Sequence, residues 1–236
     1  MNQSENPLLL NAGLNMLAVF DLDKLPAEIT QHIALDATIL KRFKQLLVFG
    51  HGGRDMWQAL QQSPDASQSD PIDHFSVHAV QNYFNQEHAD CSHCLLYPDS
   101  VQNMPLQALG KLAGWHHDSP FRIGINAEYG PWFAYRAVAL TDTALTPTTA
   151  MNGASPCQSC ADKPCISACP ANALLSGDLS LQQCMEYRLQ HDSRCKSQCI
   201  SRLACPVGSK HRYSNEQIAY HYNTSMKTIE QYQQLS

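Results

Sequence analysis

The sequence predicts an α+β protein in which a body of short strands and helices precedes a cysteine-rich module. Short apolar runs bounded by turn residues alternate with amphipathic segments over most of the first 141 residues. Eight of the ten cysteines then fall between Cys157 and Cys205, and only Cys91 and Cys94 lie outside that stretch. A cysteine-poor body is therefore followed by a cysteine-dense segment.

The chain has 236 residues, which is enough for a full core with a small appendage. We predict three parts: a body at 1–145, a module at 146–210 and C-terminal helices that pack on the body at 211–236. The Thr-, Ala- and Pro-rich stretch at 141–156 is the predicted linker between the first two parts.

Two apolar runs in the first part of the body, at 14–20 and 45–49, predict buried strands because turn residues bound both. The segment between them, 25–43, is expected to be helical or irregular. A glycine turn then leads into an amphipathic helix with Met56 facing inward. After a loop, Pro71 opens a longer helix.

The rest of the body is predicted to contain three more strands and one more helix. The strands are expected at 94–98, 121–125 and 132–140. The helix is expected within the segment 104–116 and should end at Gly114, because glycine is common just after the last helical residue. Strands interspersed with helices in this way are typical of an α/β or α+β body.

Charge and hydropathy exclude some classes of partner. The net charge of -5 is spread without a basic block, which argues against a nucleic-acid backbone as the main partner. No apolar run approaches the roughly 18 to 20 residues of a membrane span, and the first residues lack the basic region of a secretory signal. We therefore expect a cytoplasmic protein with no membrane partner, where ten cysteines indicate metal or redox chemistry instead of disulfides.

The module cysteines form two groups, C-x2-C-x4-C-x3-C-P and C-x10-C-x3-C-x5-C-P. Eight thiolates suit two 4Fe–4S clusters, since each cubane takes four. In two-cluster ferredoxins the cysteine before proline ligates the other cluster. Transferring that pattern, one cluster takes Cys157, Cys160, Cys165 and Cys205, and the other takes Cys169, Cys184, Cys195 and Cys199.

Alternatives to two clusters remain open from the spacing. The second gap is four residues instead of two, and the last group is stretched before its Cys-Pro step, so the loops differ from the ferredoxin run. Zinc would also accept C-x2-C pairs, although zinc sites usually show two evenly spaced pairs. One cluster with spare cysteines is a further alternative. Cys91 and Cys94 lack two further ligands and are interpreted as ordinary cysteines.

Four segments resemble, in the same order, cobalamin-processing proteins that remove the upper ligand of vitamin B12. The segments are 70–80, 104–117, 127–140 and 212–221, and "YGPWFAYRA" is the most specific part. That strand also resembles epoxyqueuosine reductases. These enzymes and the reductive dehalogenases carry a two-cluster module after a corrinoid-binding body, with a similar cysteine order.

The resemblance implies a modified nitroreductase-like (flavin-reductase-type) body, a C-terminal ferredoxin-like module, corrinoid binding and, by analogy, a homodimer. The predicted function is an iron–sulfur oxidoreductase that passes single electrons from two 4Fe–4S clusters to a bound cobalamin, with an unidentified electron donor. The alternatives are an electron-transfer protein without a corrinoid, an enzyme like epoxyqueuosine reductase, and a redox-sensing DNA-binding regulator.

The resemblance also implies pocket residues. Arg136 matches the arginine at the family's cobalamin and thiol-substrate pocket, and Lys111 stands where the family has a histidine. Arg136 could equally form a surface salt bridge. One wall of the pocket is predicted from the glycine-aromatic strand, whose alternative role is simply core. The wall residues are Gly130, Pro131, Trp132 and Phe133.

Three other positions bear on the choice between functions. At most one of His116 and His117 would touch cobalt, because neighbouring residues on an extended segment point to opposite faces. The stretch "QNMPLQ" has no acid where epoxyqueuosine reductases have theirs, and Asp99 lies further upstream. That absence makes epoxyqueuosine reduction the weaker interpretation.

The C-terminal segment at 215–232 is similar to a helix-turn-helix, with Asn223 at the turn. Only Lys227 is basic in the supposed recognition helix, which is weak for a partner whose phosphates dominate affinity. We therefore predict two packing helices there.

Overall fold

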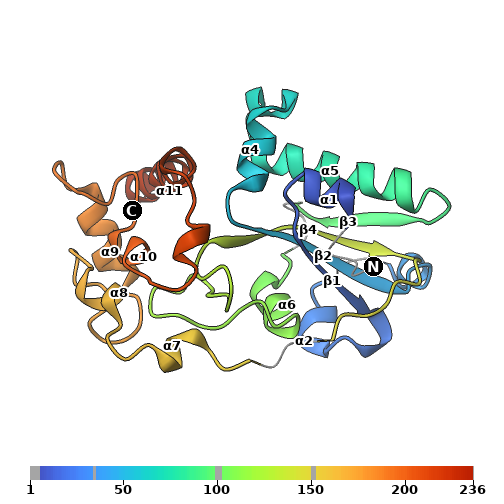
Figure 1. Cartoon of the computed structure of the whole chain (residues 1–236), viewed down its shortest axis with the longest axis horizontal. Helices are drawn as coiled ribbons and strands as arrows, with labels where there is room; N and C mark the ends of the chain where they lie inside the picture. Colours follow the sequence, from blue (N-terminus) through green and yellow to red (C-terminus); the bar gives the residue numbers. More distant parts are fainter. Residues whose placement is uncertain (1–5, 34–35, 99–102, 150–152, 236) are drawn as a thin grey trace. The chain divides into compact units, whose positions relative to one another are not determined.

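The computed structural model describes residues 6–33, 36–98, 103–149 and 153–235. It divides into two compact units (Figure 1). Unit 1 comprises Met1–Trp115 with Phe133–Asn152, and unit 2 comprises His116–Trp132 with Gly153–Ser236. The chain thus enters unit 2 twice. The predicted division into three parts stays a prediction.

Unit 1 is built on a four-stranded antiparallel sheet with strand order β1-β2-β4-β3. This confirms four of the five predicted strands and a mixed α/β fold. β2 runs three residues beyond its predicted end, past a register shift between Phe49 and Gly50. The strands are β1 (Met16–Asp21), β2 (Gln45–Gly52), β3 (His93–Tyr97) and β4 (Phe133–Thr141).

Helices cover both faces of this sheet, and every residue of β2 is buried. α5 and α1 lie along one face and α6 lies on the other (Figure 1). Phe49 of β2 packs edge-on against Tyr83 and Phe84 of α5, with ring centroids 5.8 and 6.2 Å apart. The helices are α1 (Pro7–Asn11), α2 (Ala27–Thr30), α3 (Ala37–Leu40), α4 (Asp55–Gln61), α5 (Pro71–Glu87) and α6 (Leu106–Leu112), with 3-10 turns at Leu22–Lys24 and Pro64–Ser67.

The predicted helix signals in unit 1 are confirmed. Pro71 is the first residue of α5, and Met56 is fully buried on α4. Gly114 follows α6 with φ of 73°. The Gly114 N–H donates a hydrogen bond to the Lys111 carbonyl at 3.0 Å. The Trp115 N–H donates one to the Gly110 carbonyl at 2.8 Å. This is the Schellman pattern, in which a glycine lets the chain turn left-handed and satisfy the last carbonyls.

The predicted strand at 121–125 is wrong. Among the described residues, that segment forms one isolated bridge, Ile125 to His117, and a second bridge follows it, Asn126 to Gly130. Arg122 has φ of 57°, a left-handed conformation that an extended strand does not contain. The apolar alternation of "FRIGI" therefore reflects packing of a turn instead of sheet pairing.

Apart from its long C-terminal helix at Asn215–Leu235, unit 2 has short helices, long connections and few buried apolar side chains. Two small apolar clusters hold it: Phe121, Cys165 and Leu174 in one, and Trp132, Tyr213 and Ile218 in the other. Most of the buried apolar residues that the structure describes lie in unit 1. The helices of unit 2 are α7 (Pro156–Ser159), α8 (Pro164–Ser167), α9 (Leu181–Leu189), α10 (Ile200–Leu203) and α11 (Asn215–Leu235), with a 3-10 turn at Ser209–His211.

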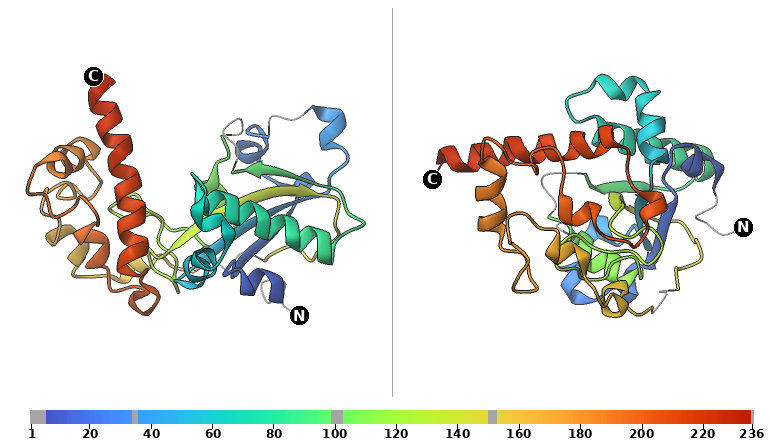
Figure 2. Two further views of the ribbon diagram at one scale, coloured as in Figure 1. Left: turned by 90° about the horizontal axis from the view of Figure 1, so that it is seen from above. Right: turned by 60° about the vertical axis from the view of Figure 1, so that its left-hand side comes forward.

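The predicted pair of C-terminal helices is also wrong, because α11 is one unbroken helix (Figure 2). Asn223 lies on its exposed side. Buried Ile218, Met226 and Ile229 continue one apolar stripe through the predicted turn, so packing favours a single helix. Without the turn, the helix-turn-helix motif is lost. Within the described residues, none of the helices is both long and apolar enough to cross a membrane.

Candidate functional site

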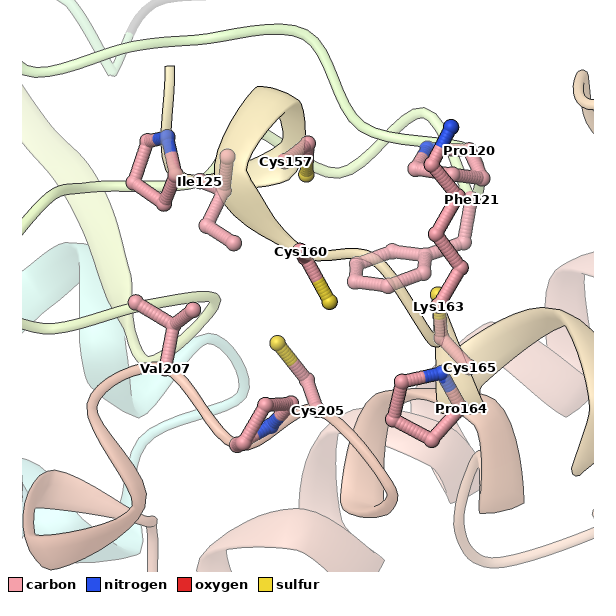
Figure 3. Close-up of a pocket in the computed structure, with 12 residues that line it drawn as sticks. Pro120, Phe121, Ile125, Cys157, Cys160, Lys163, Pro164, Cys165, Cys205 and Val207 are labelled. Carbon is pink, nitrogen blue, oxygen red and sulfur yellow. The ribbon is translucent and has the colours of Figure 1, made fainter. Parts of the chain in front are cut away.

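Four cysteines line one pocket of unit 2, with their side chains arriving from α7, from α8 and from the loop after α10 (Figure 3). Cys160 and Cys205 point toward each other across it. Lys163 is the one charged residue in the lining, and the rest is apolar. The cysteines are Cys157, Cys160, Cys165 and Cys205, and the apolar lining is Pro120, Phe121, Ile125, Pro156, Pro164, Pro206 and Val207.

Prolines place two of these thiols. Pro156 and Pro164 each begin a short helix, so Cys157 and Cys165 stand in the first helical turn. Ser155 caps the first helix by accepting a hydrogen bond from the Cys157 N–H at 3.3 Å. Each Pro-Cys pair therefore fixes the direction in which its cysteine leaves the backbone.

The thiols of this set act on one another. Burial raises the pKa of Cys157, and the nearby Cys165 and Cys160 raise it further. Burial likewise raises the pKa of Cys165, with Cys205 as the next cause. One cysteine of the second sequence group is thus brought to three of the first. A metal that binds here must displace protons, because thiols with raised pKa values are protonated at neutral pH.

The other four cysteines form a second set. Burial raises the pKa of Cys184 to about 11, and Cys199, Cys169 and Cys195 contribute to the increase. Burial also raises the pKa of Cys195. Cys199 caps α10, where its sulfur accepts the Arg202 N–H at 3.5 Å. Cys169, from the first sequence group, therefore lies with three cysteines of the second.

The donor chemistry of the two sets fits an iron–sulfur cluster. Each set supplies four thiols, and each thiolate of a cubane binds a different iron. The lining of the first set is largely apolar, which suits such a cluster.

Two glycines bring a turn of 116–132 against the chain that follows Cys205. Gly130 and Gly208 have φ of 59° and 64°. A Cβ on Gly130 would lie 2.0 Å from the Val207 carbonyl oxygen, and one on Gly208 would lie 2.2 Å from the Tyr129 carbonyl carbon. Gly130, predicted as a pocket wall, here allows a close backbone approach beside the Cys205 loop.

Trp132, another predicted wall residue, is fully buried in unit 2. The Arg202 guanidinium lies 4.5 Å from the centre of its ring and donates to the Pro131 carbonyl at 2.6 Å. Tyr213 packs edge-on against the same indole at 5.4 Å. Trp132 and Pro131 therefore pack inside unit 2, and their role as a pocket wall stays a prediction.

The remaining predicted pocket residues belong to unit 1. Arg136 is buried, so it is not a surface salt bridge, and its Nη2 lies 3.2 Å from His51 Nε2. Because guanidinium only donates, that nitrogen of His51 accepts. Burial raises the pKa of Asp73, and the charge of Arg136 acts against the increase. Phe133 packs edge-on against Tyr135 at 5.7 Å.

Other predicted positions are more dispersed. Lys111 lies on the exposed side of α6. His116 is buried in unit 2 with its ring against Gly124, whereas His117 is partly exposed and bridges to Ile125. Cys91 and Cys94 are partly exposed around the start of β3. Asp99 lies outside the described residues.

The sequence did not single out His51, Arg188 or Gly208. The "GHGG" stretch was interpreted as a turn, yet its histidine is a fully buried partner of Arg136. Gly208 and Arg188 act through segments far from them in the chain, and a short local pattern does not record such contacts.

No known protein-family profile matches this chain, and no curated protein sequence matches it. Solved structures do match. The epoxyqueuosine reductase of Bacillus subtilis has TM-score 0.50 and 15% identity, covering 88% of this chain and 66% of its own. An epoxyqueuosine reductase with a modified tRNA stem loop has TM-score 0.51 and 15% identity, covering 90% and 67%.

A reductive dehalogenase described as B12-dependent also matches, with TM-score 0.51 and 13% identity over 98% of this chain and 36% of its own. The chain therefore spans about two thirds of the reductases and about one third of the dehalogenase. At these identities the likeness establishes the fold: a mixed α/β architecture with a small antiparallel sheet, shared with these enzymes.

Proposed function

We propose that the protein is an iron–sulfur oxidoreductase that passes single electrons from two 4Fe–4S clusters to a bound corrinoid. The observation that carries the proposal is the composition of the two cysteine sets, each of which takes three thiols from one sequence group and one from the other. Unit 2 would contain the ferredoxin-like module, and unit 1 would be the modified nitroreductase-like body.

The proposed ligands of the first cluster are Cys157, Cys160, Cys165 and Cys205, and those of the second are Cys169, Cys184, Cys195 and Cys199. When bound, such clusters supply single electrons at low potential. The apolar residues around the first set would exclude water and lower the local dielectric constant. A lower dielectric constant strengthens electrostatic interactions at the cluster and so affects its reduction potential. The Pro-Cys turns hold the thiols in place.

Support for the corrinoid comes from two sources. The fold likeness includes a dehalogenase structure described as B12-dependent. Arg136 is a buried cation whose only described hydrogen-bond partner is the neutral acceptor His51 Nε2. The proposed reaction is reduction of the corrinoid cobalt or removal of its upper ligand.

A second candidate is an electron carrier that binds no corrinoid. Trp132 and Pro131 favour it, because both are packed in the core of unit 2 instead of presenting a surface to a ligand. The two candidates agree on the clusters and differ in the acceptor.

Anaerobic reconstitution with iron and sulfide tests the clusters. We expect about eight irons and eight sulfides per chain, since each cubane holds four of each. Zinc without sulfide would contradict the proposal.

Titration of the reconstituted chain with cobalamin tests the acceptor. We expect the cobalt spectrum to shift on binding and to show reduction after dithionite reduces the clusters. Arg136→Lys should weaken binding, and Lys41→Ala, at an exposed position outside the predicted pocket residues, should leave it unchanged. An unchanged cobalt spectrum in a chain with eight irons would favour the electron carrier.

A further inference from the structure

Arg188 is a buried guanidinium that lies beside the second cysteine set. It is only 6% exposed and stands on α9, one helical turn after Cys184. Its Nε donates to the Cys195 carbonyl at 3.0 Å, and its Nη2 donates to the Lys196 carbonyl at 3.3 Å. Arg188 thus holds the backbone of the loop that carries Cys195.

The C-terminal helix completes this arrangement. Arg188 Nη2 also donates to the Tyr222 carbonyl at 3.0 Å, and Nη1 donates to Ser225 Oγ at 2.9 Å. The guanidinium carbon lies 5.3 Å from the centre of the Tyr222 ring. One side chain therefore joins α9, the Cys195 loop and α11, the helix whose segment resembles a helix-turn-helix in sequence.

All of these hydrogen-bond acceptors are neutral. Within the part of the chain that the structure describes, no carboxylate pairs with Arg188. A guanidinium stays protonated in proteins. The hydrogen-bond donors of Arg188 are therefore paired, but no negative side chain among the described residues neutralises its positive charge. Because the guanidinium is buried, solvent and salt screen that charge only weakly.

This charge lies beside the second set. The guanidinium stands one helical turn from Cys184 on α9 and is hydrogen-bonded to the backbone carbonyl of Cys195. The positive charge of Arg188 would stabilise any negative charge added to a group bound by these cysteines. The cation near the first set is Lys163. Its side chain is exposed, so solvent screens its charge.

We propose that Arg188 raises the reduction potential of the cluster held by the second cysteine set, and that α11 holds the guanidinium in place for this purpose. This inference rests on the proposed function. One-electron reduction makes a cluster more negative, and a nearby uncancelled cation stabilises that state. Arg188 would be a positioning and tuning residue, since it contacts the ligand loop and not the reacting atoms.

Potentiometric titration of the reconstituted full chain, followed by electron paramagnetic resonance, tests the inference. Arg188→Gln should lower one of two potentials so that, at a fixed poise, the reduced-to-oxidised ratio falls about tenfold, ~59 mV for a one-electron couple. The other potential should not move. Arg194→Gln is the matched control, because it removes an exposed charge next to Cys195 and should shift neither potential by more than a fraction of that amount.

Arg188→Lys separates charge from structure, because lysine keeps the charge but loses most of the hydrogen bonds. If the reduction potential of the Arg188→Lys variant stays close to that of the wild type, the inference is supported. This holds even if the Arg188→Gln variant binds only four irons. A Lys variant displaced as far as the Gln variant would overturn it and leave Arg188 a structural residue. Unchanged potentials in Arg188→Gln with eight irons would also overturn it. A wild-type chain without iron and sulfide would instead overturn the proposed function, and this inference with it.

Discussion

Units 1 and 2 are stabilised by different means. Unit 1 has a sheet whose β2 is buried along its full length, with aromatic packing from α5. Unit 2 has one long helix, several short ones, two small apolar clusters and eight cysteines, four of which line one pocket. Apolar burial can account for the first unit, whereas the second has less of it, and the clusters proposed for its thiols would supply part of its folding free energy.

The strongest test of this difference is removal of iron. Chelation of the reconstituted protein should expose the amides of 153–212 to hydrogen exchange, because metal binding there supplies the free energy of folding. The sheet of unit 1 should keep its protection. Hydrogen exchange followed by mass spectrometry measures both units in one sample. Equal protection of unit 2 with and without iron would contradict the comparison.

The next test concerns which cysteines act together. Cys169→Ser should disturb the cluster of Cys184, Cys195 and Cys199 and leave the first cluster intact, although Cys169 follows Cys165 by only four residues. We expect about half of the iron to be lost, with one resonance signal remaining. Cys91→Ser, outside both sets, is the control. Loss of the first cluster's signal in Cys169→Ser would show that the sets follow the sequence order instead.

A core substitution should affect unit 1 alone. Phe49 is fully buried in the sheet, so Phe49→Ala should lower the free energy of unfolding of unit 1 by about 3–5 kcal/mol. Leu10→Ala, at a side chain that is 43% exposed, should cost much less. Urea unfolding monitored by circular dichroism measures the change, and iron content should stay constant. A parallel loss of iron would mean that the two units are not energetically independent.

The smallest expected effect is a pH dependence of unit 1. Burial raises the pKa of Tyr83 to about 12, from an ordinary value near 10. The unfolded chain therefore releases this proton first, and stability falls as pH rises from about 10 to 12, by roughly 2 kcal/mol at most. Urea unfolding at pH 9 and 11 measures it. Tyr83→Phe should flatten the dependence, and Tyr232→Phe, at an exposed site, should not.

Local pattern was sufficient for the elements of the sheet. The strands around Val19, Val48, Leu95 and Val138 are apolar runs closed by turn residues, and such runs are recorded in a few adjacent residues. The same rule failed at "FRIGI", where the left-handed conformation of Arg122 is set by packing. It failed again at Asn223, where a turn was inferred from a motif although the apolar stripe continues across it.

The site was predictable only where residue chemistry fixes it. Two Cys-Pro steps were enough to predict the sets that the structure brings together, and the ligand assignment itself stays a prediction. The contacts of His51 with Arg136, of Arg188 with Tyr222 and of Gly130 with Val207 join residues 34 to 85 positions apart. Each depends on the path of the chain between them, which no short pattern encodes.

The double entry of the chain into unit 2 limits how this module can be separated. Phe121 and Ile125 line the first pocket, yet they precede β4 in the sequence. A fragment that begins at residue 153 would carry all eight module cysteines and still lack one wall of the pocket. Unit 2 is therefore not a single C-terminal segment, and its recombination with another body would require two junctions instead of one.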